Sequence, residues 1–307
     1  MSIDISQTPS PCYLLEEGKL IANLELLRRV QQEADCKIIL ALKGFAMWSS
    51  FDLVKDYLPG CTASSLNELK LADEKFGREN HIYSAAYRED EFDEICQLAG
   101  HIVFNSVNQW NRFSKRAIDA GVSCGIRVNP GIAEVETDLY NPCFSGSRLG
   151  VRPEHLKGTE LAGIEGMHVH ALCENLADSS VALIDAFEEK ISDYIPWLKW
   201  VNFGGGHLIT HAGYDVDKLI NRIKAFRERW QVKVYLEPGG AIAWRTGPLI
   251  ASVLDIVPTD ELDVAILDIS ATAHMPDVLE MPYRPTITGA DEPDKKPHTY
   301  RLGGTSC

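Results

Sequence analysis

The sequence predicts an α/β fold, a (β/α)8 TIM barrel with a second, β-rich domain. Short apolar segments alternate with longer amphipathic ones from about residue 37 to residue 237, which is the pattern of parallel strands that alternate with helices. Eight of the short segments can be counted, and this number favours a closed barrel over an open sheet. After Gly240 the alternation stops, and strand-like segments follow one another with little helix between them.

The elements of the barrel follow from the apolar pattern of each segment. A leading helix is expected from Glu16 to Glu33. The segments Ser65–Phe76 and Val216–Trp230 repeat apolar residues at intervals of three and four, which predicts helices with one buried face. The predicted strands lie at 37–43, 60–63, 81–84, 101–105, 123–128, 164–170, 198–203 and 232–237.

The second domain is predicted from two strand-like segments at 249–258 and 264–268. Residues 11–15 have a similar composition and are expected to add a strand to this domain. We therefore expect a barrel domain over 16–245 and a β-rich domain that joins residues 1–15 to residues 246–307.

The composition disfavours several classes of protein. The 307 residues carry 30 basic and 44 acidic side chains, a formal charge of −14, whereas nucleic-acid binders are normally basic. The eight cysteines include no Cys-x-x-Cys pair, so we expect no structural zinc site. The N-terminus lacks the pattern of a signal sequence, and no apolar run is long enough to cross a bilayer. These features predict a protein of the reducing cytoplasm with unpaired thiols.

Lys43 closes the apolar first strand of the predicted barrel. Active sites of this fold lie where the strands end, and a lysine there can lose its proton and attack a carbonyl carbon. Gly44 follows it, and because glycine has no side chain another group can come close to the chain beside Lys43. The alternative is a lysine that forms a salt bridge at the barrel rim. Four other candidates also stand at predicted strand ends: Arg127, His170, Gly204 and Glu237.

Two glycine-rich segments follow the last two predicted strands. Gly204, Gly205 and Gly206 offer backbone N–H groups that can converge on a phosphate without a Cβ atom in the way. Gly239 and Gly240 can complete this cradle from the neighbouring strand. Glycines at a strand end also serve simply as turns, so the combination of both segments is what indicates a phosphate site.

Glu237 ends the eighth predicted strand. An acidic side chain beside a pyridine nitrogen keeps that nitrogen protonated and the ring electron-withdrawing, which favours loss of carbon dioxide from an attached amino acid. The alternative is a glutamate that pairs with an arginine inside the barrel, and Arg127 is the candidate partner. Together with Lys43 and the glycine segments, Glu237 predicts a site for pyridoxal 5'-phosphate.

His168 and His170 lie on one face of a predicted strand. Such a pair can bind a metal, but no matching carboxylate cluster is evident in the sequence, so no metal is expected. We expect His170 to stack on the cofactor ring and His168 to be structural. Candidate contacts for the distant amine of a cationic, polyamine-like substrate are Glu174, His274 and Asp277, although a solvated loop also explains the last two.

These motifs together resemble the fold-type III pyridoxal phosphate decarboxylases, the class with the barrel of alanine racemase. Within this class the sequence is most similar to the carboxynorspermidine/carboxyspermidine decarboxylases. The stretches that carry the resemblance extend from end to end of the chain: Ala41-Leu42-Lys43, Phe104-Asn105-Ser106, Arg127-Val128-Asn129-Pro130-Gly131, Ser147-Arg148-Leu149-Gly150, His170-Ala171-Leu172-Cys173-Glu174-Asn175, Gly204-Gly205-Gly206, Glu237-Pro238-Gly239 and Gly303-Gly304-Thr305-Ser306-Cys307.

The resemblance implies a role for each candidate residue. Lys43 would hold the cofactor, Glu237 would pair with its ring nitrogen and His170 would stack on the ring. Cys307 would reach the site of a partner subunit and donate a proton after carbon dioxide leaves. The protein would then be a homodimer with shared sites, and it would convert carboxynorspermidine or carboxyspermidine to norspermidine or spermidine. Neither nucleic acid nor a membrane is an expected partner.

Two features depart from the family pattern. Gly240 stands where the family usually has a glutamate that is thought to meet the substrate, which leaves the identity of the substrate open. The sequence also stops at Cys307, inside a motif that continues in the family. We therefore expect the β-rich domain to be incomplete at its C-terminus.

Three other interpretations stay open. A basic amino-acid decarboxylase of the diaminopimelate or ornithine type shares the glycine segments, but its Gly-Ser-Gly stretch is replaced here by Leu172-Cys173-Glu174-Asn175. A barrel that binds pyridoxal phosphate without turnover fits poorly with the β-rich domain. An aldolase that uses Lys43 directly on its substrate leaves Glu237 unexplained.

Overall fold

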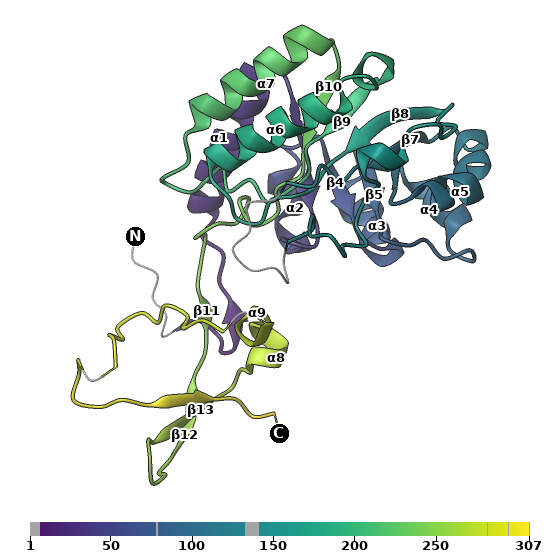
Figure 1. Ribbon diagram of the computed structural model, residues 1–307. Helices are drawn as coiled ribbons and strands as arrows, with labels where there is room; N and C mark the ends of the chain where they lie inside the picture. Colours follow the sequence, from purple (N-terminus) through teal and green to yellow (C-terminus); the bar gives the residue numbers. More distant parts are fainter. Residues whose placement is uncertain (1–6, 78, 133–140, 281, 294, 307) are drawn as a thin grey trace. The chain divides into compact units, whose positions relative to one another are not determined.

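The computed structural model describes residues 7–77, 79–132, 141–280, 282–293 and 295–306 (Figure 1). The chain divides into two compact units. One unit is Gly18–Trp244, and the other joins Met1–Glu17 to Arg245–Cys307. The predicted extents of the two domains, and the predicted incompleteness of the second, stay predictions.

The first unit is a barrel of parallel strands that closes through its first predicted strand. β2 pairs with β10, whereas β3 pairs with β4, and a single residue, Ile39, separates β2 from β3. The prediction of a (β/α)8 barrel is confirmed, with the first strand split in two. The strands are β2 Lys37–Ile38, β3 Leu40–Ala41, β4 Gly60–Ala63, β5 Glu79–Tyr83, β6 His101–Phe104, β7 Ser123–Arg127, β8 Ile164–His168, β9 Trp200–Asn202 and β10 Lys233–Leu236.

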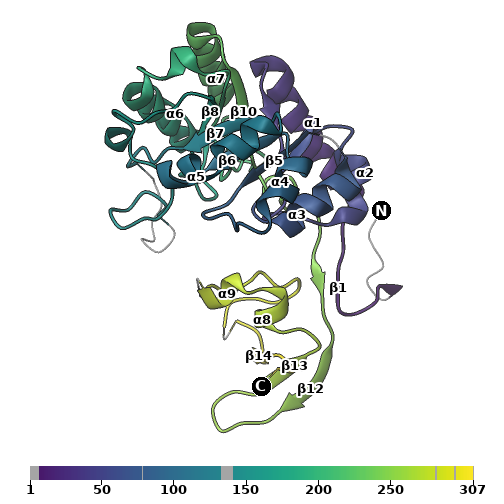
Figure 2. The same ribbon diagram turned by 90° about the vertical axis from the view of Figure 1, so that its right-hand side faces the viewer.

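Helices lie outside the ring of strands (Figures 1 and 2). Three of them begin at a residue whose side chain accepts a backbone N–H, namely Ser65, Ser106 and Asp215. Each presents an apolar face to the strands, as the predicted spacing requires. The helices are α1 Glu17–Ala34, α2 Phe51–Val54, α3 Leu66–Leu71, a π-helical turn Ala72–Phe76, α4 Phe92–Leu98, α5 Val107–Asp119, α6 Ala177–Ile191 and α7 Val216–Trp230, with 3-10 turns at Trp48–Ser50, Pro153–His155 and Ile195–Trp197.

Trp200 fills much of the barrel interior. A Cβ atom built on Gly125 would lie 2.3 Å from the Trp200 ring, and one built on Gly166 would lie 2.0 Å from it. The two neighbouring strands therefore need glycine at these positions to admit the indole. Tyr235 packs edge-on against Trp200, with ring centroids 6.2 Å apart. These large side chains make the interior a packed core and not a pore.

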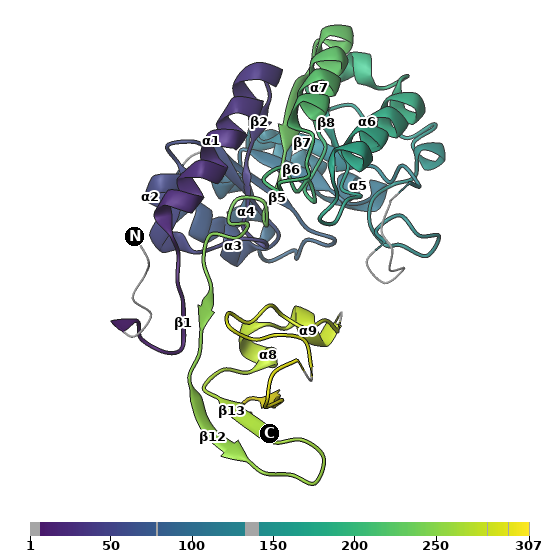
Figure 3. The same cartoon turned by 90° about the vertical axis from the view of Figure 1, so that its left-hand side faces the viewer.

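The second unit is built from short strands, and Figure 3 shows its β12 and β13 as neighbours. β1, Cys12–Tyr13, pairs antiparallel with β11, Leu249–Ile250, so the strand expected near residues 11–15 is present. Two short helices, α8 Ala271–His274 and α9 Asp277–Glu280, were not predicted. The remaining strands are β12 Val253–Val257, β13 Val264–Leu267 and β14 Arg301–Gly303. In the described part of the chain, no helix combines the length and apolar character needed to cross a membrane.

Candidate active site

A cavity opens where the barrel strands end at their carboxyl side. It brings together four of the predicted site residues, Lys43, Arg127, His170 and Glu237, which come from four different strand ends. The remaining lining residues are Ala41, Thr62, Ala63, Ser64, Tyr83 and His168.

Lys43 follows β3 and reaches into this cavity. Its side chain is exposed, although the walls of the cavity surround it. Desolvation by these walls is the largest effect on its pKa and lowers it, while Glu237 opposes this shift and Arg127 adds to it. A lowered pKa increases the fraction of neutral amine, which is the form that attacks a carbonyl.

Glu237 is buried directly after β10, and both of its oxygens are held. His168 Nε2 lies 3.1 Å from Oε2, and Asn202 Nδ2 donates to Oε1 at 2.7 Å. Burial alone would raise the pKa of this carboxyl, but His168, then His81 and Asn202, lower it to about 2. The carboxylate is therefore ionised at neutral pH inside the barrel.

Arg127 does not serve as the partner of Glu237. Its Nη2 donates to the carbonyl oxygen of His170 at 2.8 Å, and its guanidinium lies 4.6 Å from the ring centroid of Tyr83. The alternative interpretation of an arginine–glutamate pair is thus wrong, because two polar side chains on closer strands take both carboxylate oxygens.

His170 lies just beyond β8, at the mouth of the cavity. Its Nδ1 accepts the backbone N–H of Gly205 at 3.1 Å. Burial, together with the charges of Lys43 and Arg127, holds its pKa well below the usual range, so the imidazole is neutral. A neutral ring tied at one edge keeps its flat face available for stacking.

The glycine loop after β9 leaves no room for side chains. Gly204 and Gly206 have φ angles of 69° and 85°, which favour glycine. A Cβ on Gly204 would lie 2.4 Å from the Val169 oxygen, and one on Gly206 would lie 2.1 Å from the Leu172 oxygen.

Not all of the glycine N–H groups that were expected to bind a phosphate are free to do so. The N–H of Gly204 donates to Asn202 Oδ1 at 2.8 Å and that of Gly205 donates to His170, so neither is available to a phosphate. Among the described residues, by contrast, no protein acceptor meets the N–H groups of Gly206, Gly239 and Gly240. These three orphan donors come from the two predicted glycine segments and fit an anion such as a phosphate.

The remaining predicted site residues are Glu174, His274, Asp277 and Cys307, and the first of these does not line the cavity. Glu174 lies exposed in the loop after β8 with a φ of 56°, a left-handed conformation that is strained for glutamate. His274 and Asp277 belong to the second unit, where His274 O accepts the Tyr13 hydroxyl and Asp277 accepts the Tyr283 hydroxyl, each at 2.6 Å. Cys307 lies outside the described residues.

The sequence did not single out the two side chains that hold Glu237 for that role. His168 was expected to be structural, and Asn202 was not singled out, yet together they hold Glu237. One carboxylate does lie beside the His168–His170 pair, since Glu237 comes from a neighbouring part of the sheet. An isolated amide at the end of the apolar segment Trp200–Phe203 was the available signal for Asn202.

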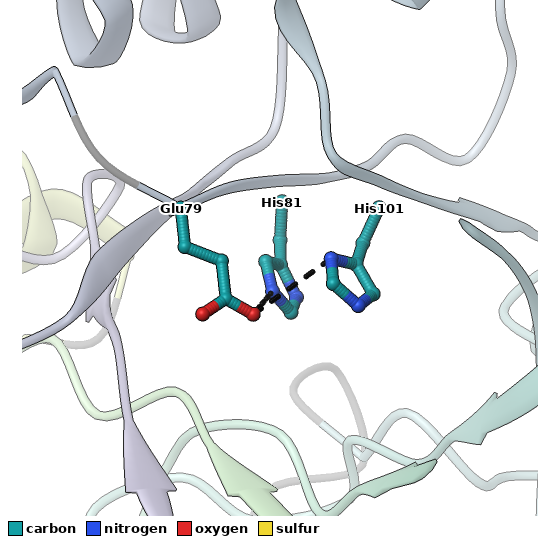
Figure 4. A group of neighbouring side chains, drawn as sticks. All are labelled: Glu79, His81 and His101. Atoms are coloured by element: carbon teal, nitrogen blue, oxygen red, sulfur yellow. Dashed lines mark hydrogen bonds and ion pairs between the residues drawn. The ribbon is translucent and has the colours of Figure 1, made fainter. Parts of the chain in front are cut away.

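A second polar cluster, also missed, lies in the barrel on strands β5 and β6 (Figure 4). Glu79 Oε1 lies 3.2 Å from His81 Nε2 and accepts the Tyr235 hydroxyl at 2.8 Å, while Oε2 pairs with Lys37. The rings of His81 and His101 stack, with centroids 4.0 Å apart and planes at 17°. An imidazole binds a metal within its own ring plane, so two stacked rings do not converge on one ion. This geometry indicates a structural cluster.

The barrel, with its cavity at the carboxyl ends of the strands, places the chain in the class of fold-type III decarboxylases. No family model matches the chain. It is 46% identical over 304 residues to a carboxyaminopropylagmatine decarboxylase of a Synechocystis species, covering 99% of this chain and 79% of that protein. It is 48% identical over 281 residues to a carboxynorspermidine/carboxyspermidine decarboxylase of Campylobacter jejuni, covering 92% and 73%.

A solved structure gives the same result. Carboxynorspermidine decarboxylase from Campylobacter jejuni, complexed with norspermidine, superimposes with a TM-score of 0.87 at 44% identity, covering 98% of this chain and 81% of that one. The chain belongs to the carboxynorspermidine/carboxyspermidine decarboxylase family.

Proposed function

We propose that this protein removes carbon dioxide from carboxynorspermidine or carboxyspermidine and forms norspermidine or spermidine, with pyridoxal phosphate bound at Lys43. One observation carries the proposal. A buried, ionised carboxylate, Glu237, lines the same cavity as Lys43, whose pKa is lowered. This pairing suits an amine that bonds to an aldehyde and a carboxylate that accepts the proton of a pyridinium nitrogen.

The cavity offers a complementary group for each part of the cofactor. Lys43 supplies the amine that bonds to the aldehyde, and Glu237 supplies the acceptor for the ring nitrogen. The orphan N–H groups of Gly206, Gly239 and Gly240 suit the phosphate, and the neutral ring of His170 suits one face of the pyridine.

The reaction divides between cofactor and protein. Bound pyridoxal phosphate supplies an electron-withdrawing ring that accepts the electron pair left when carbon dioxide departs. Glu237 would accept the proton of the ring nitrogen and so hold that nitrogen in its protonated form. His170, neutral and fixed by Gly205, would cover one face of the ring and exclude water from it. Arg127, held over Tyr83, keeps a positive charge beside Lys43 that favours the unprotonated amine.

The nature of the substrate is proposed from the relatives and from charge. The two relatives named above act on carboxylated polyamines, and the formal charge of −14 suits a cationic substrate. Glu174 at the loop after β8, with His274 and Asp277 of the second unit, stays the proposed set of substrate contacts. Carboxyaminopropylagmatine is a second candidate, because the Synechocystis relative carries that name.

Assembly and cellular location are also part of the proposal. A homodimer in which Cys307 of one chain reaches the site of the other would supply the proton that replaces carbon dioxide. The described cysteines form no disulfide bonds, which suits the reducing cytoplasm.

Release of carbon dioxide from a substrate panel tests the proposal. The panel holds carboxynorspermidine, carboxyspermidine, carboxyaminopropylagmatine, diaminopimelate, ornithine and arginine. Lys43→Ala should abolish both turnover and the visible absorption of bound pyridoxal phosphate, and Lys37→Ala serves as the control because Lys37 pairs with Glu79 outside the cavity. Turnover of diaminopimelate alone would point to that other decarboxylase type. Cofactor binding without release from any compound would point to a carrier.

A further inference from the structure

Asn202 is a fully buried polar residue between two apolar sequence neighbours. It ends β9, has no exposed surface, and lies between Val201 and Phe203, which are also fully buried. In the sheet it stands opposite His168 on β8 and Tyr235 on β10. Burying an amide costs free energy unless both its nitrogen and its oxygen form hydrogen bonds. The two hydrogen-bond partners of Asn202 therefore indicate its role.

One partner is Glu237, the proposed acceptor for the ring nitrogen, and the other is Gly204, the first residue of the loop that ends in the proposed phosphate donor Gly206. Asn202 Nδ2 donates to Glu237 Oε1 at 2.7 Å, and Asn202 Oδ1 accepts the N–H of Gly204 at 2.8 Å. Only one orientation of the amide satisfies both bonds, because its nitrogen can only donate and its oxygen can only accept. One rigid, planar group therefore joins the buried carboxylate to the first glycine of the loop.

The remaining contacts strengthen this link. His168 Nε2 faces the other oxygen of Glu237 at 3.1 Å, while its Nδ1 has no partner among the described residues, which places the proton on Nε2. Each oxygen of Glu237 thus accepts one hydrogen bond from the protein, and the carboxylate keeps further lone pairs for a third donor. Its own backbone N–H donates to Gly204 O at 2.7 Å, so Gly204 is tied on both sides.

We propose that Asn202 is a positioning residue that couples the Glu237 carboxylate to the glycine loop and thereby sets the distance between the nitrogen end and the phosphate end of the cofactor site. This inference rests on the proposed roles of Glu237 and the glycine loop. His168 completes the arrangement by preventing rotation of the carboxylate.

Asn202→Asp separates the two functions of the amide. The new carboxyl keeps an oxygen acceptor for Gly204 but loses the N–H donor to Glu237 and adds a like charge beside it. In the wild-type background the dissociation constant for pyridoxal phosphate should rise at least about 10-fold at pH 8, the scale of one lost bond to a charged group. The loss should shrink as the pH falls, because a proton shared between the two carboxyls restores the donor.

A double-mutant cycle with Glu237→Gln decides whether Asn202 acts through Glu237. If it does, Asn202→Asp should change cofactor affinity less than about twofold in the Glu237→Gln background, and the pH dependence should vanish. An equal loss in both backgrounds, or no loss in the wild type, would overturn the proposal. Asn80→Asp, the same change at another buried asparagine of the barrel, controls for a general effect of a buried charge.

The same double-mutant cycle can be measured on the protein without cofactor, which tests the coupling independently of the proposed function. Thermal unfolding without cofactor should show non-additive effects of the Asn202 and Glu237 variants, since the two side chains bond directly. If the wild-type protein takes up no pyridoxal phosphate, the proposed function fails, whereas additive unfolding temperatures would refute the coupling itself.

Discussion

Gly44 and Gly239 touch through their backbones at the point where the barrel closes. A Cβ atom built on Gly44 would lie 2.8 Å from the Cα of Gly239, and one built on Gly239 would lie 2.8 Å from the Cα of Gly44. The loop that follows Lys43 therefore rests on the loop that follows Glu237. The close approach expected from Gly44 serves this contact between backbones.

Gly44→Ala should destabilise the protein, because backbone atoms cannot move aside for the new methyl group. We expect the free energy of unfolding to fall by about 1–3 kcal/mol in a denaturant titration, the scale for overpacking a core. Gly18→Ala is the matched control, since a Cβ at Gly18 meets no atom within 4 Å. Equal stabilities for the two variants would contradict the contact.

His207 should make stability depend on pH. It is buried beside Ser180, whose Oγ lies 2.8 Å from Nδ1, and burial lowers its pKa from 6.5 to about 4. Between these values the unfolded chain binds a proton that the folded chain does not, so stability is lost as the pH falls from 6.5 to 4. The loss should total roughly 3 kcal/mol. His207→Gln should flatten this slope in unfolding experiments at several pH values, and an unchanged slope would assign the effect to other groups.

Glu237→Arg should slow catalysis far more than it weakens cofactor binding. An arginine cannot accept the proton of the ring nitrogen, so the ring loses electron-withdrawing strength while the other cofactor contacts stay. We expect kcat to fall roughly 100-fold or more, the scale of lost transition-state electrostatics. The dissociation constant for the cofactor should rise by only about tenfold, the scale of one lost bond to a charged group. Matching losses in both quantities would rule out this role of the carboxylate.

Gly240→Glu should tighten binding of a cationic substrate. Gly240 is exposed, and a Cβ built on it meets no atom within 4 Å, so the fold accepts a longer side chain there. A carboxylate at this position should lower KM for the best substrate about tenfold, the scale of one charge-assisted contact. Gly240→Gln, which adds similar length without charge, is the control. If both variants lower KM alike, the charge is not the cause.

The apolar pattern predicted the strands well because parallel strands are buried on both faces and form continuous apolar runs. The same property hides their ends. The third predicted strand shows this, since β5 begins at Glu79, two residues before the predicted start at residue 81. Glu79 is a polar residue at the start of an apolar run and looks like part of the loop. Without this carboxylate, nothing in the sequence joined His81 and His101 into a cluster.

The sequence predicted those site residues whose side-chain type and position at a strand end indicate a chemical role on their own. Lys43, His170 and Glu237 stand at strand ends, and the sheet brings them into one cavity. The partners of Glu237 depend instead on which strands are neighbours and on their register. Charge favoured Arg127, but the register places His168 and Asn202 opposite each other and within reach of the carboxylate.

The split first strand has a consequence for how the chain is made. Among the strands of the described residues, β2 pairs with β10 alone, and the residues of β10 leave the ribosome about 200 positions later. Until then one side of residues 37–38 is an open edge, the kind of surface that invites mispairing. The segment that leads to Lys43 is therefore among the first barrel segments to be synthesised and among the last to complete its hydrogen bonds in the sheet.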